Sequence, residues 1–89
     1  AEGHMDTASI VQETTRIMAN LQEVLQASGS NFSRVVKTTI YLTDMRYFPE
    51  VNQVYGAYFP EGKAPARETI GVQALPRGAR VEISMVAAK

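Results

Sequence analysis

The chain has 89 residues, nine of them basic and nine acidic, so its formal net charge at pH 7 is zero. A neutral chain argues against a strongly electrostatic partner, such as duplex DNA or an anionic membrane surface. The absence of cysteine excludes disulfides, thiolate nucleophiles and thiolate metal sites. With 45% hydrophobic residues, the composition is typical of one small globular domain, whose modest core is often completed by a partner surface.

The first five residues differ in character from the rest. The run Ala1-Glu2-Gly3-His4-Met5 is typical of a cloning and tag-cleavage remnant, so we expect a single domain over residues 6–89. The sequence shows no apolar run of bilayer length and no signal peptide, so the expected location is cytoplasmic, without a membrane partner. Because no His, Asp or Glu cluster has ligand spacing, we expect no metal site.

The first predicted element is an amphipathic helix from Asp6 to Ser28. Apolar residues recur along it at helical spacing, and Gly29 supplies a stop. The predicted stripe consists of Ile10, Thr14, Ile17, Leu21, Val24, Leu25 and Ser28.

A predicted strand from Arg34 to Leu42 follows, because β-branched residues dominate this segment. Alternation predicts one face with Val36, Thr38, Ile40 and Leu42, and another with Val35, Lys37, Thr39 and Tyr41. A second helix is predicted from about Arg46 to Phe59, where a proline at position 49 is tolerated only in the first turn.

Two further strands, Ala66–Ala74 and Ala79–Ala87, complete the predicted order α-β-α-β-β. The helix between the first two strands predicts a parallel pair, and the short link between the last two predicts an antiparallel hairpin. The predicted fold class is α+β, with two helices packed on one face of a mixed sheet. The other face stays open, which predicts an oligomer. The side chains expected on that face are Val35, Tyr41, Thr69 and Met85.

Arg67 and Glu82 are the most informative residues of the sequence. They are expected on neighbouring strands, where a lone cation and a lone anion are costly unless they meet each other, water or a ligand. The flat fork of a guanidinium matches a carboxylate ligand. The structural alternatives are ion pairs, of Arg67 with Glu68 or Glu50 and of Glu82 with Lys37, Arg67 or Arg80.

Three stretches of the sequence carry a recognisable pattern: Val35–Met45, then Phe48–Phe59, then Pro65-Ala66-Arg67 followed by Leu75-Pro76 and Val81-Glu82-Ile83. Together they resemble the RidA family, also called YjgF-like, of reactive-intermediate imine deaminases. The predicted helix agrees with the same pattern from Gln12 to Gly29, so the resemblance covers nearly all of residues 6–88.

The resemblance implies a chorismate-mutase-like fold and a homotrimer with three pockets, each between two subunits. It implies hydrolysis of small 2-imino acids, which are carboxylate substrates, to 2-keto acids and ammonia, without a metal or an organic cofactor. In the implied site Arg67 anchors the carboxylate, Glu82 positions the water, Thr69 offers backbone groups to the substrate nitrogen, and Asn52 lies near the pocket. For the Thr69 side chain the alternative is a plain strand preference, and for Asn52 it is a cap or loop packing.

The chain also departs from the family pattern. Relatives begin with further strands that carry a Gly-Pro-Tyr-Ser-Gln run and a Ser-Gly-Gln run, and neither run occurs here, so the chain resembles the C-terminal part of the fold. Without those strands the pocket would be more open and its electrostatics weaker. There are two alternative functions. One is a non-catalytic scaffold that binds small molecules or proteins. The other is an RNA-directed ribonuclease or translation inhibitor, and the neutral net charge argues against it.

Overall fold

A computed structural model describes residues 7–88. The expected tag remnant, residues 1–5, and the expected first helical residue, Asp6, lie outside the described residues. The elements are the helices α1 (Thr7–Ala27) and α2 (Phe48–Gly56) and the strands β1 (Val35–Leu42), β2 (Ala66–Gly71) and β3 (Val81–Ala87). The predicted order α-β-α-β-β is therefore confirmed, although β2 ends at Gly71, earlier than expected.

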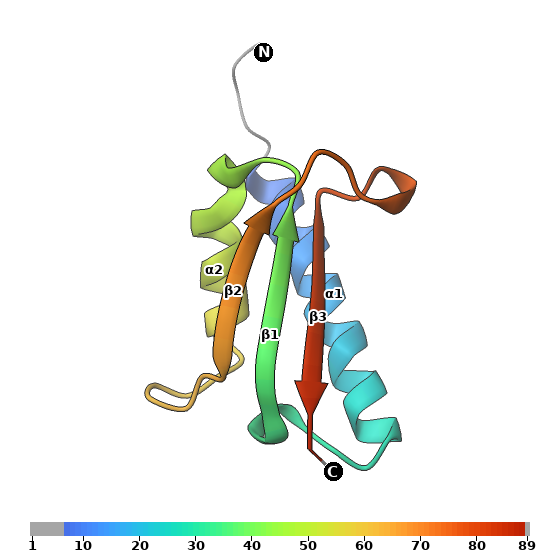
Figure 1. The fold of residues 1–89 in the computed structure, drawn as a ribbon, viewed down its shortest axis with the longest axis vertical. Helices are drawn as coiled ribbons and strands as arrows, with labels where there is room; N and C mark the ends of the chain where they lie inside the picture. Colours follow the sequence, from blue (N-terminus) through green and yellow to red (C-terminus); the bar gives the residue numbers. More distant parts are fainter. Residues whose placement is uncertain (1–6, 89) are drawn as a thin grey trace.

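The three strands form one sheet in the order β2-β1-β3 (Figure 1). β1 is parallel to β2, as predicted, and antiparallel to β3. The predicted hairpin between β2 and β3 is wrong, because the segment from Val72 to Arg80 is long enough to pass over the end of β1. β1 takes the central position because it is the strand with the most buried side chains, whereas β2 is exposed along most of its length.

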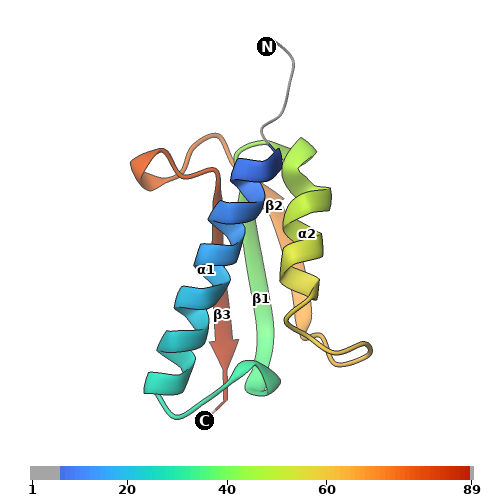
Figure 2. The ribbon, with the colours of Figure 1, turned by 180° about the vertical axis from the view of Figure 1, so that it is seen from behind.

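Both helices cover the same face of the sheet, and the other face is open (Figure 2). The predicted α+β fold class is therefore confirmed. The core lies between the helices and the sheet, and its fully buried apolar side chains are Ile10, Met18, Ile40, Leu42, Val51 and Val81. Neither helix within residues 7–88 combines the length and the apolar character needed to cross a membrane.

The buried stripe of α1 differs in part from the predicted one. Met18 is fully buried and was not predicted, whereas Val24 is 64% exposed and Ser28 is exposed as well. Residues 10, 14, 18 and 25 follow one line along the helix, and that line faces the sheet. Val24 lies further round the helix, beside the free edge of β3, where no strand covers it.

A β-bulge reverses the predicted faces at the start of β1. The register with β3 shifts between Val35 and Lys37, and Val36 is the extra residue. Val35 is therefore buried in the core and Val36 is 56% exposed, which is the opposite of the prediction. From Lys37 onward the predicted alternation holds, with Thr38, Ile40 and Leu42 facing the helices.

The open face of the sheet carries other side chains than expected. Of the predicted set only Tyr41 lies there, because Val35 is in the core and Thr69 and Met85 pair with the core-facing Ile40 and Thr38. Residues that pair across strands share a face, so the register places Lys37, Tyr41, Glu68, Ile70, Glu82 and Val86 on the open face.

Candidate functional site

The side chain of Arg67 lies beside α2 on the helix-covered face of the sheet. The residue pairs with the buried Thr38 of β1, which fixes this face, but β2 is an edge strand and the arginine is exposed. Its Nη1 donates a hydrogen bond to Oδ1 of Asn52. Its guanidinium carbon lies 5.4 Å from the ring centre of Phe48 and 5.5 Å from that of Tyr55. Within residues 7–88 Arg67 forms no ion pair, so neither Glu68 nor Glu50 neutralises it.

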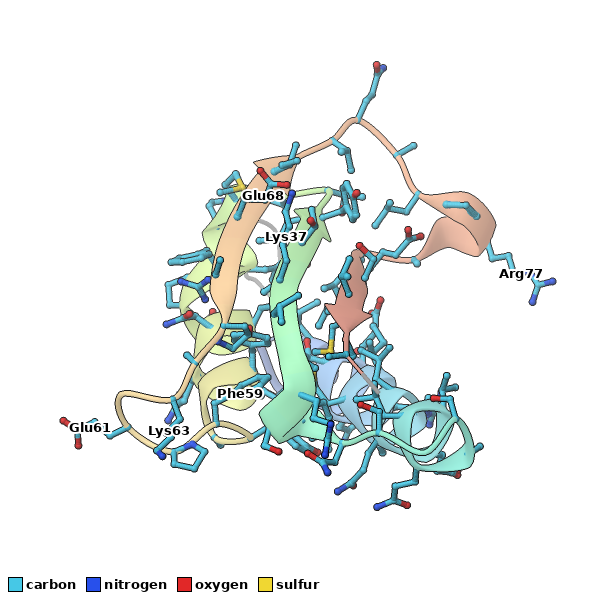
Figure 3. The ribbon with its side chains drawn as sticks, turned by 60° about the horizontal axis from the view of Figure 1, so that its bottom comes forward. Lys37, Phe59, Glu61, Lys63, Glu68 and Arg77 are labelled. Carbon is cyan, nitrogen blue, oxygen red and sulfur yellow. The ribbon has the colours of Figure 1, made fainter. Side chains whose placement is uncertain are left out.

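Glu68 lies on the opposite face and has another partner. Its carboxylate is 3.4 Å from Nζ of Lys37 and accepts a hydrogen bond of 3.2 Å from the Thr39 hydroxyl. The two charged side chains lie next to each other in Figure 3. Because both are about half exposed, the pair contributes at most about 1 kcal/mol. This pair excludes the predicted alternative in which Glu68 holds Arg67.

Glu82 lies on the open face, at the other edge of the sheet from Arg67. It pairs with Tyr41 across the β1–β3 ladder, is exposed, and forms no ion pair within residues 7–88. The prediction that Arg67 and Glu82 occupy neighbouring strands is wrong, because β1 runs between them. A single copy of the chain therefore leaves the two residues on opposite faces and does not bring them together.

Thr69 and Asn52 both lie on the Arg67 side of the sheet. Thr69 pairs with Ile40, so it shares the helix-covered face with Arg67, as the two-residue spacing predicts. Its Oγ1 is buried and has no hydrogen-bond partner within the described residues. Asn52 lies inside α2 and is not its cap, and its side-chain oxygen accepts the bond from Arg67. The structure thus assembles Arg67, Asn52 and Thr69, without Glu82.

Two aromatic residues, Tyr55 and Phe48, also belong to this site. Tyr55 is 3% exposed, and its hydroxyl donates a 3.0 Å hydrogen bond to Oγ1 of Thr38. Its ring nevertheless also borders Arg67, as does that of Phe48. The spacing of residues 48, 52 and 55 places their side chains on one face of a helix, and this pattern could have indicated a shared role.

A second polar cluster joins α1 to the start of β3. The Glu13 carboxylate accepts hydrogen bonds of 2.9 Å from both the Nε and the backbone N–H of Arg80, and the Ser9 hydroxyl accepts one of 2.7 Å from Nη2. Burial lowers the pKa of Arg80, but hydrogen bonds with Glu13 and Tyr47 outweigh that effect and raise the pKa above its ordinary value. Arg80 is therefore held by Glu13 and is not the partner of Glu82.

A groove of about 880 Å³ runs along the free edge of β3. Apolar side chains of α1 form one wall and the start of β3 forms the other. Its lining includes Ile17, Leu21, Val24, Val81, Glu82 and Ile83. The described residues hold no group of three His, Cys, Asp or Glu side chains that could bind a metal ion. The groove thus adjoins Glu82 and is remote from Arg67, which is on the other edge strand.

Comparison with known proteins gives consistent matches over the whole chain. The family model described as Endoribonuclease L-PSP matches residues 1–89. Protein DfrA of Myxococcus xanthus is 52% identical over 83 residues, which are 93% of this chain and 63% of that protein. The 2-iminobutanoate/2-iminopropanoate deaminase of Mus musculus is 45% identical over 87 residues, which are 98% of this chain and 64% of that protein.

A solved structure agrees with the described fold. The Rid family protein YyfA of Yersinia pestis, a protein of unknown function, superposes with a TM-score of 0.87 at 39% identity, covering 90% of this chain and 64% of that one. The chain therefore spans somewhat less than two thirds of the length of these relatives.

Proposed function

The chain belongs to the Endoribonuclease L-PSP family, and from this premise we propose that it hydrolyses small 2-imino acids to 2-keto acids and ammonia. The family resemblance noted from the sequence is confirmed, and the mouse relative carries the name of such a deaminase. The observation that carries the proposal is the set of contacts made by Arg67. Its guanidinium is held by Asn52 and two aromatic rings, and no carboxylate of residues 7–88 pairs with it.

Arg67 is the proposed anchor for the substrate carboxylate. A guanidinium offers two parallel N–H donors whose spacing matches the two oxygens of a carboxylate, and such a pair fixes the angle of the bound molecule as well as its position. One donor of Arg67 is used by Asn52, which leaves the rest of the fork for a ligand. In the proposed arrangement the backbone of Thr69, two residues further along β2, contacts the imine nitrogen.

Glu82 is the proposed general base that activates the attacking water molecule. Its carboxylate takes a proton from a water molecule as the water oxygen attacks the imine carbon, and it passes this proton to the imine nitrogen, which gives a tetrahedral amino alcohol. The carboxylate then takes the hydroxyl proton and delivers it to the nitrogen as the C–N bond breaks, so ammonia leaves, the carbonyl forms and the carboxylate is regenerated. Because Glu82 and Arg67 lie on opposite faces of one chain, this step requires Glu82 of one subunit and Arg67 of another.

A homotrimer is the proposed assembly that supplies such pairs. On the open face of the sheet the exposed Ile70 pairs with Tyr41, and the exposed Val86 pairs with Lys37, next to the exposed Val36 of the bulge. Exposed apolar patches of this kind, beside two uncovered strand edges, are typical of interfaces. Cytoplasmic location remains part of the same proposal. Light scattering at several protein concentrations measures the assembly directly.

The proposed activity is tested with an imine generated in situ from an amino acid, following keto acid and ammonia release. We expect Arg67→Ala to lower kcat/KM by about a hundredfold, as expected when a bidentate charge-assisted contact is lost. Arg77→Ala is the matched control, because Arg77 is exposed and projects away from the protein (Figure 3). The proposal fails if the wild-type rate equals that of buffer, or if both variants behave alike.

A non-catalytic binding scaffold is a second candidate, and one observation favours it. Arg67 and Glu82 are both exposed, and catalytic groups in contact with bulk water lose much of their electrostatic effect. Pyruvate binding that depends on Arg67, without any turnover of the imine, would identify this candidate. Salt-sensitive binding of RNA would instead indicate the RNA-directed function, against which the zero net charge argues.

A further inference from the structure

Three residues of α2 form a single surface that contacts Arg67. Phe48, Asn52 and Tyr55 follow each other at intervals of four and three residues, which places them on one side of the helix. Asn52 accepts a hydrogen bond from Nη1, and the two rings lie 5.4 and 5.5 Å from the guanidinium carbon. An arginine side chain on an exposed edge strand would otherwise sample many rotamers, because it has four rotatable bonds.

The two rings are themselves held in place by separate contacts. The Tyr55 ring is fixed by the hydrogen bond from its hydroxyl to Thr38 and by contact with the Phe59 ring at 4.9 Å. Phe48 is fixed by the start of α2, where Asp44 caps the preceding turn by accepting the backbone N–H of Arg46. Phe48 packs against the core without being fully buried. The part of the Phe48 ring that the core does not cover is therefore available for contact with Arg67.

We propose that Phe48, together with Tyr55, is a positioning residue that fixes the plane of the Arg67 guanidinium so that its fork meets a flat carboxylate. Asn52 sets the rotation of that plane by taking one N–H donor, and the rings restrict its tilt through cation–π contact. The consequence for ligand binding rests on the proposed function, whereas the ordering of Arg67 does not depend on it.

The test compares Phe48→Leu, which removes the ring, with Phe48→Tyr, which keeps it. Phe32→Leu is the matched control, because Phe32 is also partly buried against the core and its ring packs on those of Tyr58 and Phe59. If Phe48→Leu does not fold, Phe48→Met replaces it, since methionine fills a similar volume without a ring.

The first readout is the NMR signal of the Arg67 Nε–Hε group, identified by its loss in Arg67→Lys. We expect Phe48→Leu to move this signal toward that of the exposed Arg77, whereas Phe48→Tyr and Phe32→Leu leave it in place. An unchanged signal in Phe48→Leu overturns the inference, because the ring would then have no part in holding Arg67.

The second readout is the dissociation constant of pyruvate. We expect about fivefold to tenfold weaker binding in Phe48→Leu and less than about twofold change in the other two variants. Wild-type affinity in Phe48→Leu overturns the positioning role even if the NMR signal moves. If the wild-type protein binds no pyruvate, the proposed carboxylate anchor fails, and the NMR readout alone decides whether Phe48 orders Arg67.

Discussion

Replacing Glu13 by Gln is expected to lower the free energy of unfolding by about 2 kcal/mol. The Glu13 carboxylate receives two hydrogen bonds of 2.9 Å from Arg80, one from its backbone and one from its Nε. Gln keeps one acceptor oxygen, but its NH2 group would face the other donor, so one charge-assisted bond is lost. The side chains of Arg80 and Glu13 are only 28% and 25% exposed, so solvent screens this bond incompletely.

The effect is measured by urea unfolding followed by circular dichroism, at equal protein concentrations because assembly shifts apparent stability. Glu23→Gln is the matched control, since Glu23 is exposed on α1 and forms no ion pair within residues 7–88. For a domain of this size, a loss of about 2 kcal/mol lowers Tm by about 8–16 °C. If Glu13→Gln and Glu23→Gln unfold within about 0.5 kcal/mol of each other, Glu13 does not anchor β3 as described.

Two further predictions concern stability. Val35→Ala should lower the free energy of unfolding by about 2 kcal/mol because it removes buried methyl groups, whereas Val36→Ala should change it by less than about 0.5 kcal/mol. Equal losses in urea titrations would contradict the β-bulge. The hydrogen bonds from the Arg46 side chain and backbone lower the pKa of Asp44 below its ordinary value of 3.8. A lowered folded-state pKa stabilises the fold above the unfolded-state pKa, and this contribution is lost as the pH falls through the folded-state value. Wild-type protein should therefore lose more stability than Asp44→Asn between about pH 5 and pH 2, and parallel losses in urea unfolding would refute this assignment.

The sequence predicted the type and order of the three strands and the two α-helices, because each of these elements shows its own periodicity. Strand neighbours were harder to predict. The link from Val72 to Arg80 is short enough to suggest a hairpin and long enough to cross β1, so its length alone does not decide where β3 pairs. The burial of β1 decides it, since a strand with so many buried side chains is stabilised most at the centre of the sheet.

The candidate site was predicted only in part, because it too depends on which strands are neighbours in the sheet. Arg67 and Thr69 share a face because alternation along a strand is a local property. The separation of Arg67 from Glu82 depends on which strand lies between them, and this information is not local. The bulge at Val36 could not be predicted either, because one extra residue reverses the faces of the strand without any change in the apolar pattern of the sequence.

The most direct test of the account mixes two variants that each lack one of the proposed catalytic groups, Arg67→Ala and Glu82→Gln, under conditions that allow subunits to exchange. Each variant supplies the residue that the other lacks, so a site shared between two subunits regains both groups in mixed assemblies. In an equal random mixture, the account predicts about one quarter of the wild-type deaminase activity. A mixture that exchanges subunits and stays inactive would show that Arg67 and Glu82 of different subunits do not act together.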